Sequence, residues 1–195
     1  MSLQPAHHQN ILAPHYPEHF PLCVDLDGTL VKEHTLWHLN AHKKPGFLKN
    51  FFPFSWPLIK EKMAHCADLS TTRWTYHTRL IDCLRLWHAQ GVRLYLVTGA
   101  PEKIAHHVAD RLGLFSDVWA SSSSHNLVGR NKGAHLCHQF GVYGYTYIGD
   151  TWKDRLVWNT SKDIITVGKQ NSLLTRYLHH TKTEHQNVFS IPHDA

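Results

Sequence analysis

Two aspartates two positions apart, Asp25 and Asp27, follow a short apolar run and precede Gly28. Residues 22–24 are Leu, Cys and Val, a continuous apolar run typical of a strand covered on both faces, and the glycine lets the backbone turn sharply just past it. In α/β sheets, ligands bind at the carboxyl ends of such strands. Two neighbouring carboxylates resist being ionised together unless a cation joins them. The stretch therefore predicts a metal site at the end of a buried strand.

Three later stretches place further polar groups at the ends of expected strands or at the starts of expected helices. The apolar run at residues 94–97 leads to Thr98 and Gly99, where a hydroxyl and free backbone amides can hold an anion at a helix start. A lysine opens a later helix, and the strand expected at residues 145–149 is followed by two more acids four residues apart. The candidate site consists of Asp25, Asp27, Thr98, Gly99, Lys132, Asp150 and Asp154.

The elements that must hold these groups alternate between helix and strand patterns along the chain. Apolar residues at helical spacing predict a helix that begins at Thr71 or Thr72 and ends at Gly91. Further helices are expected at residues 101–112, from Lys132 to Gly141 and at 172–180, and further strands at 118–120 and 164–167. Such alternation favours a parallel sheet with helices on both faces. The predicted fold class is α/β, a doubly wound parallel sheet with a small helical cap inserted after the first strand.

In their order and at these strand ends, the motifs resemble the four motifs of the haloacid dehalogenase (HAD) superfamily. They are Asp25-Leu26-Asp27-Gly28-Thr29, Thr98, Lys132, and Gly149-Asp150 with Asp154. The resemblance covers roughly residues 20–178 and implies a HAD, Rossmann-like core. More narrowly, the chain resembles the soluble HAD domain fused ahead of membrane prenyltransferases of the ubiquinone-biosynthesis type. The runs that carry this narrower resemblance are residues 24–32, 112–121 and 147–150.

This resemblance implies a Mg²⁺-dependent phosphatase that hydrolyses a phosphomonoester through an aspartyl-phosphate intermediate. Asp25 would be the nucleophile, and Asp27 would be the general acid and base. Mg²⁺ favours oxygen ligands, which Asp25, Asp150 and the backbone carbonyl of Asp27 would supply. Asp154 would hold a metal-bound water. Phosphoryl oxygens would be bound by Thr98, Gly99 and Lys132.

Alternative functions share parts of this assignment. A phosphotransferase would pass the phosphoryl group to a second alcohol, whereas a dehalogenase would not normally keep the second acid, Asp27. A non-catalytic module could instead associate with a membrane prenyltransferase. The expected ligands are a small phosphorylated metabolite or a prenyl-linked phosphate. Nucleic acid is not expected, because the basic residues are scattered rather than gathered on one face.

The segment between the first two motifs is interrupted by prolines and is expected to form the cap. Aromatic residues gather at residues 47–56, either packing over the site or contacting a membrane interface beside a prenyltransferase. His34, His38 and His42 lie four residues apart and would form one stripe on a helix, where they could bind a metal. The fusion domains that the chain resembles usually carry an acid where His34 stands, so the histidine puts the family's substrate in doubt.

Length and composition are typical of a single domain with a small insertion. The chain has 195 residues, a formal net charge of +5, 19 histidines and four cysteines without CxxC spacing. Reduced cysteines, no apolar run long enough to span a bilayer and no signal-like N-terminus indicate a cytoplasmic protein. The expected divisions are a flexible leader at 1–19, the HAD core at 20–33 and 71–180, the cap at 34–70, and a flexible tail at 181–195.

Overall fold

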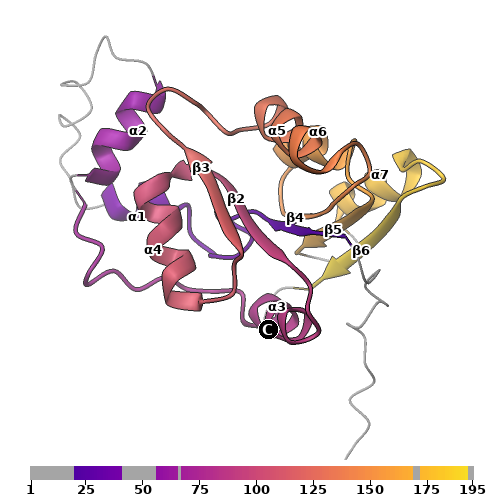
Figure 1. Cartoon of the computed structure of the whole chain (residues 1–195), viewed down its shortest axis with the longest axis horizontal. Coiled ribbons are helices and arrows are strands. Elements are labelled where there is room, and N and C mark those ends of the chain that lie inside the picture. Colours follow the sequence, from indigo (N-terminus) through magenta and orange to yellow (C-terminus); the bar gives the residue numbers. More distant parts are fainter. Residues whose placement is uncertain (1–19, 41–55, 66, 169–171, 193–195) are drawn as a thin grey trace, which may run out of the picture.

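The computed structural model describes residues 20–40, 56–65, 67–168 and 172–192 (Figure 1). The expected leader at 1–19 and the aromatic stretch at 47–55 lie outside these residues, as does His42. Among the described residues, the helices are too short or too polar to cross a membrane.

A six-stranded parallel sheet forms the centre of the fold, in the order β3-β2-β1-β4-β5-β6. Its strands are β1 (Leu22–Val24), β2 (Leu94–Pro101), β3 (Asp117–Ser121), β4 (Thr146–Gly149), β5 (Asp163–Val167) and β6 (Asn187–Ile191). Val24 pairs with Leu96 of β2 on one side and with Ile148 of β4 on the other. The motifs that follow these three strands therefore emerge side by side at one edge of the sheet.

Helices cover both faces of the sheet, which confirms the predicted doubly wound α/β fold. They are α1 (Thr35–Asn40), α2 (Trp56–His65), α3 (Thr78–Ala89), α4 (Glu102–Leu112), α5 (Arg130–Phe140), α6 (Arg155–Trp158) and α7 (Leu173–Thr181), with a short 3₁₀ helix η2 (Trp152–Asp154). Figure 1 shows α1 to α4 grouped on one side of the molecule and α5 to α7 on the other.

Two hydrophobic cores result from the alternation of side chains along the strands. Leu22 and Val24 point to a core that contains buried residues of α2, α3 and α4. Cys23, between them, points to the opposite core, which contains buried residues of α5, α6 and α7. Because successive strand residues face opposite sides, the apolar run of β1 supplies both cores at once.

Helix α3 begins later than the sequence predicts. It starts at Thr78 rather than at Thr71 or Thr72, and its N-cap residue is His77. The preceding residues are extended instead: Tyr76 forms an antiparallel bridge with Val31, next to the start of the inserted segment. Tertiary pairing thus overrides the helical spacing of the apolar residues in this stretch.

The expectation of a flexible tail at residues 181–195 is wrong in part, because residues 187–191 form the edge strand β6. This strand pairs in parallel with β5 over its full length. Val188 and Ile191 are buried, so the strand closes the sheet on that side. The alternation of apolar and polar residues in β6 is short and lies among other polar residues, so the sequence does not indicate a strand. The strand pairs with β5, 24 residues earlier in the chain.

Helix α2 lies within the segment expected to be the cap, and it packs closely on the core. Met63 and Ala64 are buried in the same hydrophobic cluster as β1 and β2. Lys103 of α4 donates to the carbonyl oxygens of His65 and Ala67, at 3.1 and 2.9 Å, and so holds the C-terminal end of α2. The described part of the insertion is therefore joined to the sheet by both apolar and polar contacts.

Candidate active site

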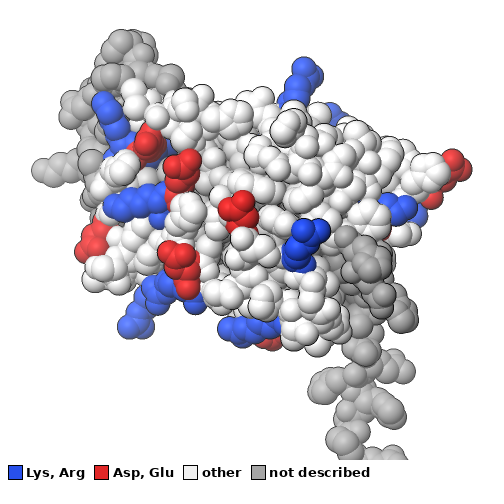
Figure 2. Space-filling model, viewed as in Figure 1, with Lys and Arg blue, Asp and Glu red and all other residues white. Residues whose placement is uncertain are grey.

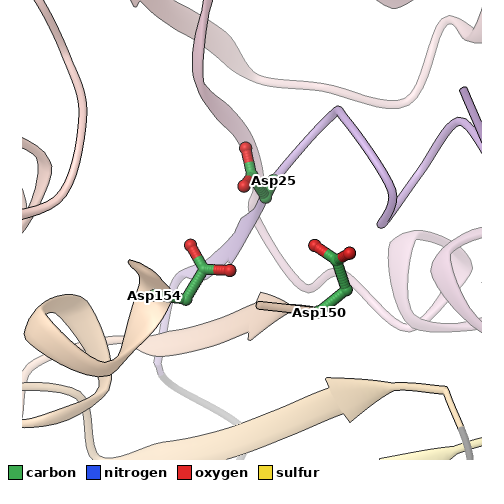
Figure 3. A group of neighbouring side chains, drawn as sticks. All are labelled: Asp25, Asp150 and Asp154. Carbon is green, nitrogen blue, oxygen red and sulfur yellow. The ribbon is translucent and has the colours of Figure 1, made fainter. Parts of the chain in front are cut away.

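Three carboxylates converge where β1 and β4 end (Figure 3). Asp25 follows β1, Asp150 follows β4, and Asp154 ends the 3₁₀ helix η2. One ligand oxygen from each lies within 4.8 Å of the others. The sequence predicts these three acids as metal ligands, and the parallel topology brings them together because β1 and β4 are neighbours in the sheet.

Two glycines make room for these acids. Gly28 has a φ of +76°, which favours glycine, and a Cβ atom there would collide with the Asp150 carboxylate. A Cβ atom on Gly149 would lie only 2.7 Å from Asp154 Oδ2. The turn after Asp27 and the end of β4 thus need glycine for close approach to the acids.

Hydrogen bonds from two threonines fix the orientation of Asp150 and Asp154. The Thr29 hydroxyl donates to Asp150 Oδ1 at 3.0 Å. The backbone amide and the hydroxyl of Thr151 each lie 3.1 Å from Asp154 Oδ2. Asp154 is thus held by the loop that carries it, whereas Asp150 is held by the turn that follows β1.

Lys132 is the buried cation beside the acids. Its Nζ lies 3.0 Å from Asp25 Oδ1 and 3.9 Å from Asp154 Oδ1. The ammonium group also donates to the Tyr147 hydroxyl at 2.7 Å, and that hydroxyl donates to Asp154 Oδ1 at 3.1 Å. Tyr147 therefore bridges the lysine and an acid, a role that the sequence analysis does not identify. Its one signal is a tyrosine in a fully buried strand, whose hydroxyl needs a partner.

Burial and mutual repulsion keep the acids from ionising freely. Burial, together with the charges of Asp154 and Asp27, raises the pKa of Asp25 to about 7, although Lys132 acts in the opposite direction. Burial also raises the pKa of Asp150 to about 6, again helped by the Asp154 charge. Lys132 alone does not compensate the charge of the ionised acids at this edge. The oxygen donors of Asp25, Asp150 and Asp154 and their spacing fit a divalent cation such as Mg²⁺.

A pocket of about 240 Å³ opens beside the acids. It is lined by all but one of the predicted site residues: Asp25, Asp27, Thr98, Gly99, Lys132 and Asp154. Asp150 stands beside it in the acid cluster. The structure therefore brings all seven predicted residues to one place.

Asp27 and Thr98 have distinct environments within this pocket. Asp27 Oδ1 accepts a hydrogen bond from the Thr35 amide of α1 at 2.7 Å, which ties the acid to the start of the insertion. Thr98 is fully buried, and its Oγ1 accepts a hydrogen bond from the Ala100 amide at 3.0 Å. Because this oxygen already acts as an acceptor, the Thr98 hydroxyl proton can be directed to a ligand.

One histidine of the predicted stripe, His34, and one lysine of the insertion, Lys60, line the pocket. His34 is exposed and lines the pocket, whereas His38 is exposed and its ring centroid lies 5.7 Å from that of Trp74. Lys60 of α2 also lines the pocket, although it is 6% exposed and was not singled out from the sequence. A lysine in a helix that also carries other charged residues gives no sequence signal of burial.

Comparison with known proteins identifies the family. The sequence model of the haloacid dehalogenase-like hydrolases matches residues 48–156, a range that includes Thr98, Lys132, Asp150 and Asp154 and begins after Asp25. A curated relative, the uncharacterized protein y4nM of Sinorhizobium fredii, is 33% identical over an alignment of 156 residues that covers 76% of this chain and 30% of the relative. The chain thus spans less than a third of the length of that relative.

Solved structures share the fold at low sequence identity. A protein of unknown function from Bordetella pertussis aligns with a TM-score of 0.62 and 12% identity, covering 88% of this chain and 98% of that one. A phospho-aspartyl intermediate analogue of phosphoserine phosphatase aligns with a TM-score of 0.59 and 14% identity, covering 90% and 95%. These likenesses establish the fold, and the matched sequence model establishes the family. The chain belongs to the haloacid dehalogenase-like hydrolases.

Proposed function

We propose that this hydrolase is a Mg²⁺-dependent phosphatase that cleaves a phosphomonoester through an aspartyl-phosphate intermediate. The observation that carries the proposal is the position of Asp25. Its carboxylate lies in the pocket with Thr98 and Lys132, groups suited to phosphoryl oxygens, and within 4.8 Å of two further acids suited to a cation. This combination fits phosphoryl transfer, in which positioning and charge compensation supply most of the catalysis.

The acid cluster would hold the metal ion. Asp25, Asp150 and the backbone carbonyl of Asp27 would supply its protein ligands, and Asp154 would hold a bound water. When bound, Mg²⁺ would offset the charge of the phosphoryl group and of the acids around it. Raised pKa values at Asp25 and Asp150 support this assignment, because a cation removes the repulsion that keeps a proton on each carboxylate.

Asp25 would act as the nucleophile. Its Oδ1 accepts from the Leu26 amide at 2.8 Å and lies 3.0 Å from Lys132 Nζ, which fixes the plane of the carboxylate. One carboxylate oxygen would form a bond to phosphorus while the bond between phosphorus and the ester oxygen breaks. Thr98 and Lys132 would bind the remaining phosphoryl oxygens through their O–H and N–H groups.

Asp27 would carry the protons. Its proton would pass to the departing ester oxygen in the first step. As a carboxylate, it would then take a proton from the water that attacks phosphorus, releasing phosphate and restoring Asp25. The bond from the Thr35 amide to Asp27 Oδ1 leaves the second carboxyl oxygen for this exchange, and it makes the placement of Asp27 depend on α1.

The proposed substrate is a small phosphorylated compound. A pocket of about 240 Å³ suits a phosphoryl group with a small alcohol. A prenyl-linked phosphate, contact with a membrane prenyltransferase and a cytoplasmic location remain predictions from the sequence. The prenyltransferase contact depends mainly on the aromatic stretch at 47–56, most of which lies outside the described residues.

Hydrolysis of p-nitrophenyl phosphate with and without Mg²⁺ tests the function. We expect the activity to disappear on chelation and Asp25→Asn to fall to the background rate, because the nucleophile and one metal ligand are lost together. Asp82→Asn changes an exposed acid on α3 and is the matched control. Full activity of Asp25→Asn would refute the mechanism. Release of free phosphate, rather than a phosphorylated added alcohol, separates a phosphatase from a phosphotransferase.

A further inference from the structure

Lys60 of the inserted helix α2 lines the pocket and joins three segments that are far apart in the sequence. Its ammonium group donates to the Gly99 carbonyl oxygen at 2.6 Å and to Asn126 Oδ1 at 2.8 Å. A longer contact, 3.4 Å, reaches the Ser121 hydroxyl. These acceptors belong to the end of β2, the end of β3 and the loop after β3, so one side chain connects the insertion to both strands.

The contact between Lys60 and Gly99 affects Thr98, the threonine proposed to bind phosphate. The Gly99 carbonyl belongs to the same peptide unit as the Ala100 amide, which donates to Thr98 Oγ1 at 3.0 Å. By holding the carbonyl oxygen, Lys60 fixes the orientation of that peptide and of the amide on its other side. The Thr98 hydroxyl then accepts from the backbone and keeps its own hydrogen for an anion in the pocket.

The charge of Lys60 has no paired carboxylate among the described residues, since its hydrogen-bond acceptors are neutral groups. Burial lowers the pKa of Lys60, while the nearby Asp27 charge acts in the opposite direction. Lys132, by comparison, lies 3.0 Å from Asp25. A buried ammonium group without an ion-pair partner is costly, so an anion that enters the pocket gains from Lys60 more than it would from a paired lysine.

We propose that Lys60 is a positioning residue for the phosphoryl group: it holds the turn at residues 98–100 in its anion-binding form and is electrically balanced by the bound phosphoryl group. This inference rests on the proposed phosphatase function and adds the inserted helix to the phosphoryl site. Because Lys60 acts on the phosphoryl group, its removal weakens binding of every phosphomonoester and of inorganic phosphate alike, whatever alcohol is attached.

The first experiment measures the Kd of inorganic phosphate by calorimetry in the presence of Mg²⁺, together with KM and kcat for p-nitrophenyl phosphate. Lys60→Met should raise Kd and KM roughly tenfold to a hundredfold, the size expected for losing a charge-assisted interaction, and should change kcat less. Lys62→Met removes an exposed lysine two residues away on the same helix and should leave all three values unchanged. Thermal unfolding checks that both variants fold.

A second variant keeps Lys60 and changes only its electrostatic partner. Asn126→Asp conserves shape and places a carboxylate where the amide oxygen lies, 2.8 Å from the ammonium group. This internal counter-ion should compete with phosphate and raise its Kd about tenfold. A merely structural lysine would bind the new carboxylate more tightly and leave phosphate affinity unchanged. Ser124→Asp adds the same charge at an exposed site of the same loop and is the control.

An unchanged phosphate Kd in Asn126→Asp overturns the proposal, whatever Lys60→Met does. An equal increase in Ser124→Asp also overturns it, because general repulsion would then account for the effect. The two hypotheses fail separately: a wild-type protein that binds phosphate without hydrolysing the ester refutes the phosphatase function but leaves the Lys60 test in place.

Discussion

We expect the metal-free protein to lose stability as the pH rises through the range in which its buried acids ionise. Folding raises the pKa of Asp25 from 3.8 to about 7 and that of Asp150 from 3.8 to about 6. An acid with a higher pKa in the folded state binds its proton more tightly there than in the unfolded chain. The free energy of unfolding therefore falls as pH rises from about 4 to about 7.

The structure sets the size of this loss. At about 1.36 kcal/mol per pH unit, the increase at Asp25 corresponds to about 4 kcal/mol and that at Asp150 to about 3 kcal/mol. Burial is the main cause of both increases, so the two losses add to at most about 7 kcal/mol. Domains of this kind have a net stability of about 5–15 kcal/mol, so the effect is large enough to measure.

Urea unfolding at several pH values, with a chelator or with excess MgCl₂, measures the effect. Other titratable groups contribute to the pH dependence of both proteins alike, so the useful quantity is the difference between wild type and Asp150→Asn. Without metal, the variant should match wild type near pH 4 and exceed it by up to about 3 kcal/mol at pH 8. MgCl₂ should stabilise wild type more at pH 8 than at pH 5, and the variant hardly at all. Parallel pH profiles, or equal stabilisation of both proteins by Mg²⁺, would refute the reasoning.

Two further variants test the proton carrier and the buried bridge. Asp27→Asn should keep its affinity for inorganic phosphate while kcat falls by about 10²–10⁴, because leaving-group protonation and water activation are lost. Retained turnover of an alkyl phosphate would assign the role of general acid and base to another group. Tyr147→Phe removes a hydroxyl that contacts both Lys132 and Asp154 and should lower the free energy of unfolding by about 1.5–3 kcal/mol. Unchanged urea unfolding of Tyr147→Phe would show that Lys132 and Asp154 compensate directly.

The site residues could be predicted because they follow strands with a strong apolar pattern. Val24, Val97 and Ile148 are fully buried at the ends of such runs, and parallel pairing places the next residues of each strand at one edge. A correct strand assignment and the motif order were therefore enough to predict the acid cluster. Asp25 and Asp150 needed no knowledge of loop conformation, since they directly follow β1 and β4.

Other features depend on contacts between segments that local patterns do not encode. The helical spacing around Trp74 predicts a longer α3, but the bridge between Val31 and Tyr76 keeps that stretch extended. Strand β6 is stable only because β5 offers a complete edge for pairing. In both cases a partner distant in sequence decides the conformation, and intrinsic propensity is too weak to oppose it.

The net charge of the pocket depends on the acids, on the two lysines and on the inserted helix that carries Lys60. Asp25, Asp27, Asp150 and Asp154 together exceed the two buried ammonium groups of Lys60 and Lys132, so a phosphate dianion would meet net negative charge if every acid ionised. A divalent cation held by Asp25, Asp150 and Asp154 would offset this negative charge at the acid cluster. Lys60 supplies positive charge at the turn at residues 98–100, through a helix that the core holds by Met63 and Ala64. If the proposal for Lys60 holds, the insertion would contribute to recognition of the phosphoryl group itself, and its remaining surface would be left to distinguish one alcohol from another.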